Sequence, residues 1–235
     1  MFYLYCLSDE ATARMLEAVA GVGGVAPRVI EFEGIAVVLS EWAEVSVPVT
    51  RENVLAHERV VGRILKETTP LPFRFGTLAD EERIRSYVVS QKASLLSALE
   101  RVRGAVEMSV KIIWDVSEER LGEVADEGQA LEVGAGAGTR FLLEKRRELA
   151  GEERLRRRAE NLSARLAETL REVVKDSFVQ VNPAESLVIN ASHLVERKAV
   201  NAYRARIEGA RREQPELRFL TSGPWPPYSF SNLFS

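Results

Sequence analysis

A short run bounded by prolines, at residues 70–76, most constrains how this chain can fold. After Pro70, apolar residues alternate with a proline and an arginine, and a glycine follows: Leu71, Pro72, Phe73, Arg74, Phe75 and Gly76. The alternation predicts a strand with one apolar face. Because Pro72 has no N–H to donate to a neighbouring strand, we predict that this strand lies at the edge of a sheet.

Apolar residues at helical spacing flank this run on both sides. Before it, Thr50 is a suitable N-cap for a helix of about four turns, which has to end ahead of Pro70. After it, the pattern predicts a longer helix over about 78–104, ended by Gly104. Upstream, we predict a strand over 2–7, a helix over 9–19, and a hairpin of strands 28–32 and 35–40.

The first half therefore has the element order βαββαβ. This order predicts a ferredoxin-like α+β domain over 1–104, in which a four-stranded antiparallel sheet carries helices on one face and 78–104 is a connecting helix. The second half repeats the order over 105–235, with strands 106–116, 178–181, 187–194 and 217–221, a long charged helix 139–176 and a helix 195–212. We thus expect two ferredoxin-like domains joined by a helix.

The C-terminal tail, 223–235, is rich in proline and aromatic residues. Its distinctive residues are Gly223, Pro224, Trp225, Pro226, Pro227, Tyr228 and Phe230. Aromatic side chains are costly to leave in water, so we expect a docked tail that covers its own domain or the seam between domains. The alternative is an exposed proline-rich ligand for the aromatic groove of a partner.

Composition limits the classes of function. A net charge of −3 with 29% charged residues supplies no general attraction for nucleic acid or an anionic membrane. Cys6 is the only cysteine, which excludes an intramolecular disulfide and fits a reducing cytoplasm. The apolar N-terminus lacks the charged head of a signal peptide and is too short to span a membrane.

Residues that could carry chemistry are few. The glycine run 134–138 precedes a helix, but Gly138 stands where a phosphate-binding loop needs lysine, so we interpret the run as a flexible lead-in rather than an anion site. His57 lies on an apolar stripe, and we interpret it as a hydrogen-bonded core or interface histidine rather than a ligand or base. Arginines within 146–158 alternate with glutamates, which indicates a solvated helix face rather than a nucleic-acid site. We expect no catalytic, cofactor-binding or metal-binding residues.

Three stretches carry a resemblance to a known family: LAHERVVGRILKETTPLPFRFGTLADEERIRSYV, LLSALERVRGAVEMSVKIIW and LTSGPWPPYSF. They resemble the gas vesicle protein F/L family, and the segments between them fit in order. The resemblance implies a minor, non-enzymatic protein needed to assemble gas-filled protein shells. It implies the shell protein and other accessory vesicle proteins as partners, a cytoplasmic and gas vesicle location, and no nucleic acid, membrane or small-molecule substrate.

Two motifs are the candidates for partner binding or for a structural role: Pro72, Phe73, Arg74, Phe75 and Gly76, and Gly223, Pro224, Trp225, Pro226, Pro227, Tyr228 and Phe230. An edge strand over 71–75 is a template for strand addition by a shell subunit. The competing hypothesis is a small-molecule-binding regulatory domain or an enzyme, since ferredoxin-like units carry many kinds of ligand site.

Overall fold

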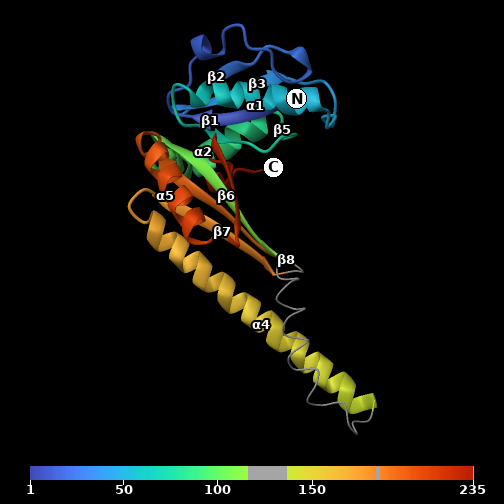
Figure 1. Cartoon of the computed structure of the whole chain (residues 1–235). Coiled ribbons are helices and arrows are strands. Elements are labelled where there is room, and N and C mark those ends of the chain that lie inside the picture. Colours follow the sequence, from blue (N-terminus) through green and yellow to red (C-terminus); the bar gives the residue numbers. More distant parts are fainter. Residues whose placement is uncertain (116–136, 184–185, 235) are drawn as a thin grey trace. The chain divides into compact units, whose positions relative to one another are not determined.

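The structure is a computed structural model, and it describes residues 1–115, 137–183 and 186–234 (Figure 1). The chain forms two compact units. Unit 1 comprises 1–108, 194–198 and 223–235, and unit 2 comprises 109–193 and 199–222. Most of the glycine run 134–138 lies outside the described residues.

Unit 1 is built on an antiparallel sheet of short strands. They are β1 (Phe2–Ser8), β2 (Arg28–Phe32), β3 (Ile35–Glu41) and β4 (Leu71–Pro72), in the order β2-β3-β1-β4, and β5 (Leu78–Ala79) also pairs with β1. β4 is the last strand in this order, so the predicted edge position of Pro72 is confirmed.

Both faces of this sheet are covered. Tyr3 and Tyr5 of β1 pack against the helix α1 (Arg51–Leu65), whereas Leu4 and Leu7 pack against α2 (Glu81–Val102). The register of β1 against β3 shifts between Leu4 and Cys6, and this irregularity moves Cys6 to the same side as Tyr5. Burial on both faces explains why six consecutive residues of β3 are buried.

The two helices begin at the residues that local chemistry predicts. Thr50 accepts the backbone N–H of Asn53 at 3.2 Å, and Asp80 accepts that of Arg83 at 2.8 Å. Each cap satisfies one of the free N–H groups of a first helical turn. The predicted helix near 50–65 is therefore confirmed, and the longer one begins at Glu81, slightly later than expected.

The predicted helix 9–19 is wrong. The chain forms two 3-10 turns instead, η1 (Ala13–Leu16) and η2 (Val22–Gly24). Ser8 Oγ accepts the N–H groups of Glu10 and Ala11, both at 3.1 Å, and this side-chain turn competes with the start of an α-helix.

The predicted strand over 71–76 is also wrong in extent. Only Leu71 and Pro72 pair as β4, because the chain turns at Gly76 with φ +88°, and Thr77 N–H and Oγ1 both donate to the Arg74 carbonyl. Phe73 then packs on the α2 side of the sheet and Phe75 on the α1 side, so the two rings do not share one face.

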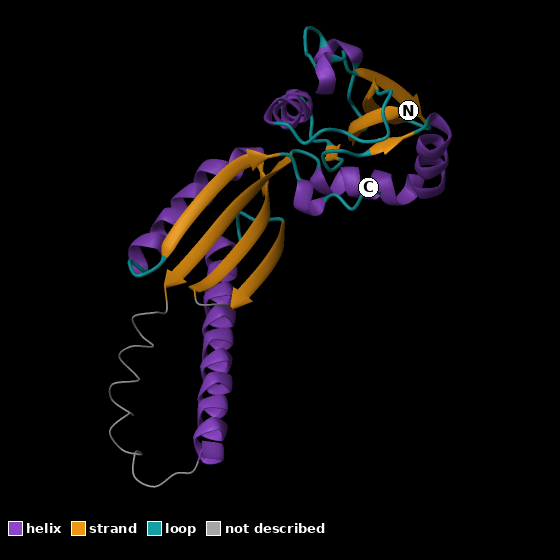
Figure 2. Cartoon of the chain, turned by 90° about the vertical axis from the view of Figure 1, so that its right-hand side faces the viewer, coloured by secondary structure: helices purple, strands orange, loops and turns teal. Residues whose placement is uncertain are grey.

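Unit 2 contains most of a four-stranded sheet and two helices. The elements are β6 (Ala105–Asp115), α4 (Ala137–Leu170), β7 (Asp176–Pro183), β8 (Ser186–Glu196), α5 (Val200–Glu213) and β9 (Arg218–Trp225). The strand order is β7-β8-β6-β9, and α4 and α5 cover one face (Figures 1 and 2). Buried side chains at helical spacing face the sheet from both: Ala159, Leu162, Leu166 and Leu170, and Tyr203, Ile207 and Ala210.

Two boundaries differ from the sequence-based expectation. The tail, assigned to a domain over 105–235, belongs to unit 1 together with the first 108 residues, because its aromatic side chains pack into the core of that unit. The helix expected from residue 195 begins at Val200, since β8 continues to Glu196 and a 3-10 turn, η3 (Arg197–Ala199), follows. The chain as described has a mixed α/β fold with antiparallel sheets.

Candidate functional site

The C-terminal tail docks on unit 1 at the edge strand β4. Pro226 and Pro227 are buried, and they lead into a 3-10 turn, η4 (Tyr228–Phe230). Ser231 Oγ then donates to the Pro72 carbonyl at 2.8 Å, on the strand that ends the sheet. The tail thereby covers the edge that the sequence predicted to be open.

A partly buried chain of hydrogen bonds connects the tail to α1 and β1. Tyr228 OH donates to Glu58 Oε1 at 2.9 Å. The Tyr228 oxygen then accepts from His57 Nε2 at 3.0 Å, which leaves His57 Nδ1 to accept from Tyr3 OH at 2.7 Å. Gly76 N–H donates to the Tyr3 oxygen at 3.3 Å. This assignment makes His57 a neutral ring protonated on Nε2.

Burial controls the charge of these groups. His57 is 1% exposed, and burial lowers its pKa to about 4. Burial raises the pKa of Tyr3 and Tyr228 above the ordinary tyrosine value, and the nearby Glu58 carboxylate adds to the rise at Tyr228. His57, Tyr3 and Tyr228 are therefore neutral at physiological pH. The sequence-based interpretation of His57 as a hydrogen-bonded core residue is confirmed.

We expect Tyr228→Phe to lower the free energy of unfolding by about 1–3 kcal/mol, since it leaves His57 Nε2–H and Glu58 without their partner. Urea denaturation monitored by circular dichroism measures the loss. Glu58→Gln is the matched control, because its amide oxygen can still accept from Tyr228 and it should cost less. Equal stability of Tyr228→Phe and the parent protein would contradict the hydrogen-bond chain.

We also expect stability to fall in mild acid. His57 and His193 each have a pKa lowered from 6.5 to about 4 by burial. The unfolded chain takes up these protons near pH 6.5 and the folded chain only near pH 4, so the free energy of unfolding falls as the pH drops through that window. Each histidine contributes up to about 3 kcal/mol to this loss.

Urea denaturation between pH 7 and pH 5 tests this expectation before most carboxylates are protonated. An NMR titration of the two histidine Cε1–H resonances gives the native pKa values directly. A native histidine that titrates near 6.5 would show that its ring is not held neutral by burial.

A carboxylate anchors the next residue of the tail. The buried Glu107 accepts the backbone N–H of Ser229 at 2.8 Å and its hydroxyl at 2.7 Å. Upstream, Gly223 has φ +109°, and a Cβ there would lie 2.7 Å from the Glu107 carbonyl oxygen. A glycine is therefore required where the tail backbone passes β6.

Apolar side chains complete the dock on the α2 side of the sheet. Phe230 is 5% exposed and belongs to the same buried cluster as Phe73. The Phe234 ring lies 5.5 Å from that of Phe73 and 4.5 Å from that of Tyr87, both edge-on. Because Tyr228 meets the α1 side and Phe230 the α2 side, the tail wraps the edge of the sheet from one face to the other.

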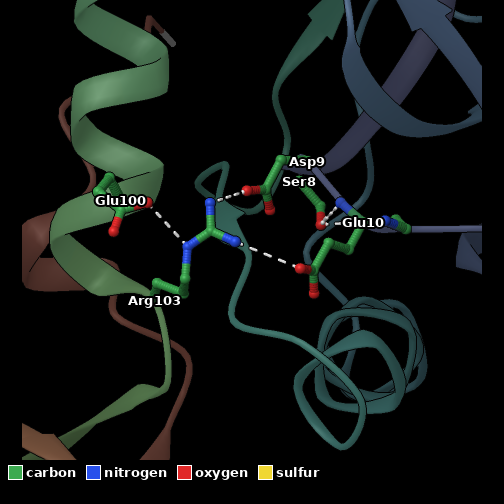
Figure 3. A network of polar contacts seen from close by, with 6 residues as sticks. Ser8, Asp9, Glu10, Glu100 and Arg103 are labelled. Carbon is green, nitrogen blue, oxygen red and sulfur yellow. Dashed lines mark hydrogen bonds and ion pairs between the residues drawn. The ribbon is translucent and has the colours of Figure 1, made fainter.

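An exposed ion-pair cluster joins the C-terminal end of α2 to the turn after β1 (Figure 3). The Arg103 guanidinium binds Asp9, Glu10 and Glu100 at once. Asp9, and then Glu100, raise the pKa of Arg103 above its ordinary value. These charges are open to water, so we interpret the cluster as a positioning contact rather than a binding centre.

The predicted site residues fall into three groups by burial. The buried ones are Pro72, Phe73, Pro226, Pro227 and Phe230, and Phe75, Gly223 and Tyr228 are partly buried. Arg74, Gly76, Pro224 and Trp225 are exposed, and Trp225 keeps 46% of its surface accessible, so the expectation that its ring is buried is wrong.

Sequence reasoning missed three residues of the dock. Tyr3 gives no signal, because it lies within an apolar strand. Glu107 could have been found as the one acidic residue among the apolar residues that open β6, and Ser229 as the polar residue between two anchoring aromatic residues. Glu107 and Ser229 bind each other across 122 positions of the chain, which local patterns do not reveal.

The dock does not have the form of a catalytic site. Both ring nitrogens of His57 are engaged in hydrogen bonds and the ring is 1% exposed, so no substrate can reach them. Within 1–115, 137–183 and 186–234, no group of three or more histidine, cysteine or acidic side chains could hold a metal ion. None of the helices described is long and apolar enough to cross a membrane.

The chain was also compared with known protein families. Residues 1–232 match the gas vesicle synthesis proteins GvpL/GvpF. The chain belongs to this family. Membership implies a role in gas vesicle formation, and the family is one of gas vesicle structural and assembly proteins. It also implies association with other gas vesicle components.

Individual relatives extend over nearly the whole chain. The protein is 26% identical to gas vesicle protein L of a Streptomyces species and to gas vesicle protein F1 of Halobacterium salinarum, in each case over 98% of this chain and 92% of the relative. The crystal structure of GvpF from an Anabaena species superposes with a TM-score of 0.77 at 21% identity, over 100% of this chain and 97% of that one. The similarity in structure indicates a shared fold.

Proposed function

We propose that this protein is a non-enzymatic accessory factor that acts as a scaffold or chaperone for the gas vesicle shell protein in the cytoplasm and on the growing vesicle. Family membership over residues 1–232 is the observation that carries the proposal. A shell subunit hides its hydrophobic face only once it has polymerised, so a soluble protein has to bind the subunit or the growing edge beforehand.

We also propose that both units follow the ferredoxin-like plan. The order β4-β1-β3-β2 in unit 1 and the order β9-β6-β8-β7 along the second sheet support this assignment, since each puts the first and third strands of a βαββαβ set in the middle. In unit 1, the 3-10 turns η1 and η2 take the place of the first helix.

The motif residues have to be divided between two roles. The buried residues hold the tail against unit 1, so we propose that they contribute to stability and keep the exposed residues of the two motifs in place. Arg74 is exposed and makes no ion pair or side-chain hydrogen bond to any described residue, which leaves it available for a partner. We propose Arg74 as a polar contact to vesicle proteins.

Co-purification from cells that express the vesicle proteins tests this function. A tagged full-length chain is expected to retain the shell protein and accessory proteins. Arg74→Glu should lower that yield with an unchanged melting temperature, whereas Arg14→Glu, which reverses an exposed arginine of η1, should leave it intact. A wild-type chain that retains no vesicle protein would refute the proposal.

A groove in unit 2 allows a test of the competing hypothesis, a small-molecule-binding regulatory domain or an enzyme. It has a volume of about 470 Å³ and lies between α4, α5 and the sheet, with Ile112, Leu166 and Phe219 among its apolar walls. This volume is within the range of small-molecule sites. We expect native mass spectrometry of the purified protein to find no bound metabolite, and a stoichiometric ligand would favour a regulatory or enzymatic role instead.

A further inference from the structure

Two of the outer strands, β4 and β2, are protected against pairing with another chain. β4 is two residues long, and its Pro72 carbonyl accepts a hydrogen bond from the Ser231 hydroxyl of the tail. β2 carries Glu31 and Arg28, and Arg28 pairs with Glu41 at 3.5 Å. β9 carries Arg218 and Pro224 only near its ends, and in its central part it exposes Leu220 but buries Phe219. Short length, charge and proline are the usual means of blocking an edge strand.

β7 carries a charged residue and a proline only at its ends, Asp176 and Pro183. It is eight residues long, and Ser177–Val181 contains neither charge nor proline. Phe178 is 50% exposed and Val179 is 43% exposed, although adjacent residues of a strand point to opposite faces. Among the described residues, β8 is its only neighbour in the sheet. β7 therefore offers a row of backbone donors and acceptors with apolar side chains on either side.

We propose that β7 is a docking edge, on which an extended apolar segment of another polypeptide pairs as an added strand. Under the proposed function, on which this assignment rests, that segment belongs to the shell protein. Backbone hydrogen bonds would hold the added strand, and its alternate apolar side chains would cover Phe178 on one face and Val179 on the other.

The size and the charge of the edge favour this occupant over a second copy of the chain. Two β7 strands paired with each other would bury less than the roughly 1,200 Å² that a specific, stable dimer requires. A single added segment needs no such area, because it can bind at moderate affinity through the backbone. An uncharged edge selects a segment without charge, since a charged side chain would lose hydration against Phe178 or Val179.

The experiment uses the full-length chain, two edge variants and a matched control. Phe178→Lys and Val179→Lys each place a charge on β7, and Leu220→Lys does the same on β9 at a residue of almost equal exposure, 49%. Two probes are used: the co-expressed shell protein, and a synthetic ten-residue peptide of alternating valine and threonine with a lysine at each end. The same peptide with alternate N-methylated residues cannot form the ladder.

We expect each β7 variant to weaken shell-protein binding about tenfold at an unchanged melting temperature, and Leu220→Lys to bind as the parent does. Hydrogen exchange at the amides of Ser177–Val181 should slow with the shell protein and with the unmodified peptide, but not with the N-methylated one. Shell-protein binding that leaves these amides unprotected and the β7 variants unaffected would overturn the proposal.

The two probes separate the possible failures. A chain that does not bind the shell protein while its β7 amides are protected by the unmodified peptide would refute the proposed function and support the docking edge. Absence of protection with both probes would refute the docking edge, whatever the co-purification experiment finds.

Discussion

Deletion of 223–235 is expected to remove on the order of 5 kcal/mol or more from the free energy of unfolding, which is comparable with the whole stability of a domain. Phe230 is 5% exposed and Phe234 packs edge-on against Phe73, so the deletion opens the α2 side of the core. It also leaves His57 and the buried Glu107 without their tail partners. Calorimetry should show that unit 1 loses its cooperative transition or melts far below the intact chain.

Point variants keep this expectation testable if the deleted chain does not fold. Phe230→Ala should cost about 3–5 kcal/mol, whereas Trp225→Ala, at a ring that is 46% exposed, should cost about 1 kcal/mol or less. An unchanged melting temperature after deletion, together with sharp, mobile tail resonances in the intact protein, would exclude a docked tail.

Phe73→Ala is expected to lower the free energy of unfolding by about 3–5 kcal/mol. The side chain is 1% exposed and lies where the core of unit 1 meets the tail. Its removal would leave a cavity, because the surrounding core residues cannot move together to fill the space. Urea denaturation followed by circular dichroism measures the loss. The expected loss exceeds any effect of Arg74→Glu on stability, because Arg74 is exposed.

Phe75→Ala is the matched control for Phe73→Ala. Its ring is only partly buried and meets Tyr3 and His57 at centroid distances of 6.1 and 6.0 Å, so a smaller loss is expected. Equal losses for the two variants would contradict the placement of the rings on opposite faces of the sheet.

Local chemistry was sufficient to predict α1, α2 and the apolar strands. The caps at Thr50 and Asp80 act through N–H groups three residues away, so the signal lies within one helical turn. The edge position of Pro72 follows in the same way from its missing N–H. Resemblance to known sequences, rather than spacing, supplied the family.

Elements that depend on distant contacts could not be predicted. The alternation around Phe73 indicated a longer strand, but β4 ends where Thr77 closes a turn onto Arg74 and the tail binds the edge. The helix expected over 9–19 gave way to turns that start at Ser8. In both places, a side-chain hydrogen bond prevailed over periodicity.

The amino-acid sequence by itself determined that α1 and α2 are helices preceded by capping residues, and that the chain has an apolar strand with its one cysteine and an aromatic tail. Only the tertiary structure decided where that tail goes. Tyr228 and His57 are 171 positions apart, and the bond between them depends on α1, β1 and the tail all being in place. The tertiary structure also decided that β7 is an outer strand. Among the described residues it pairs only with β8, and the sequence of β7 does not show this.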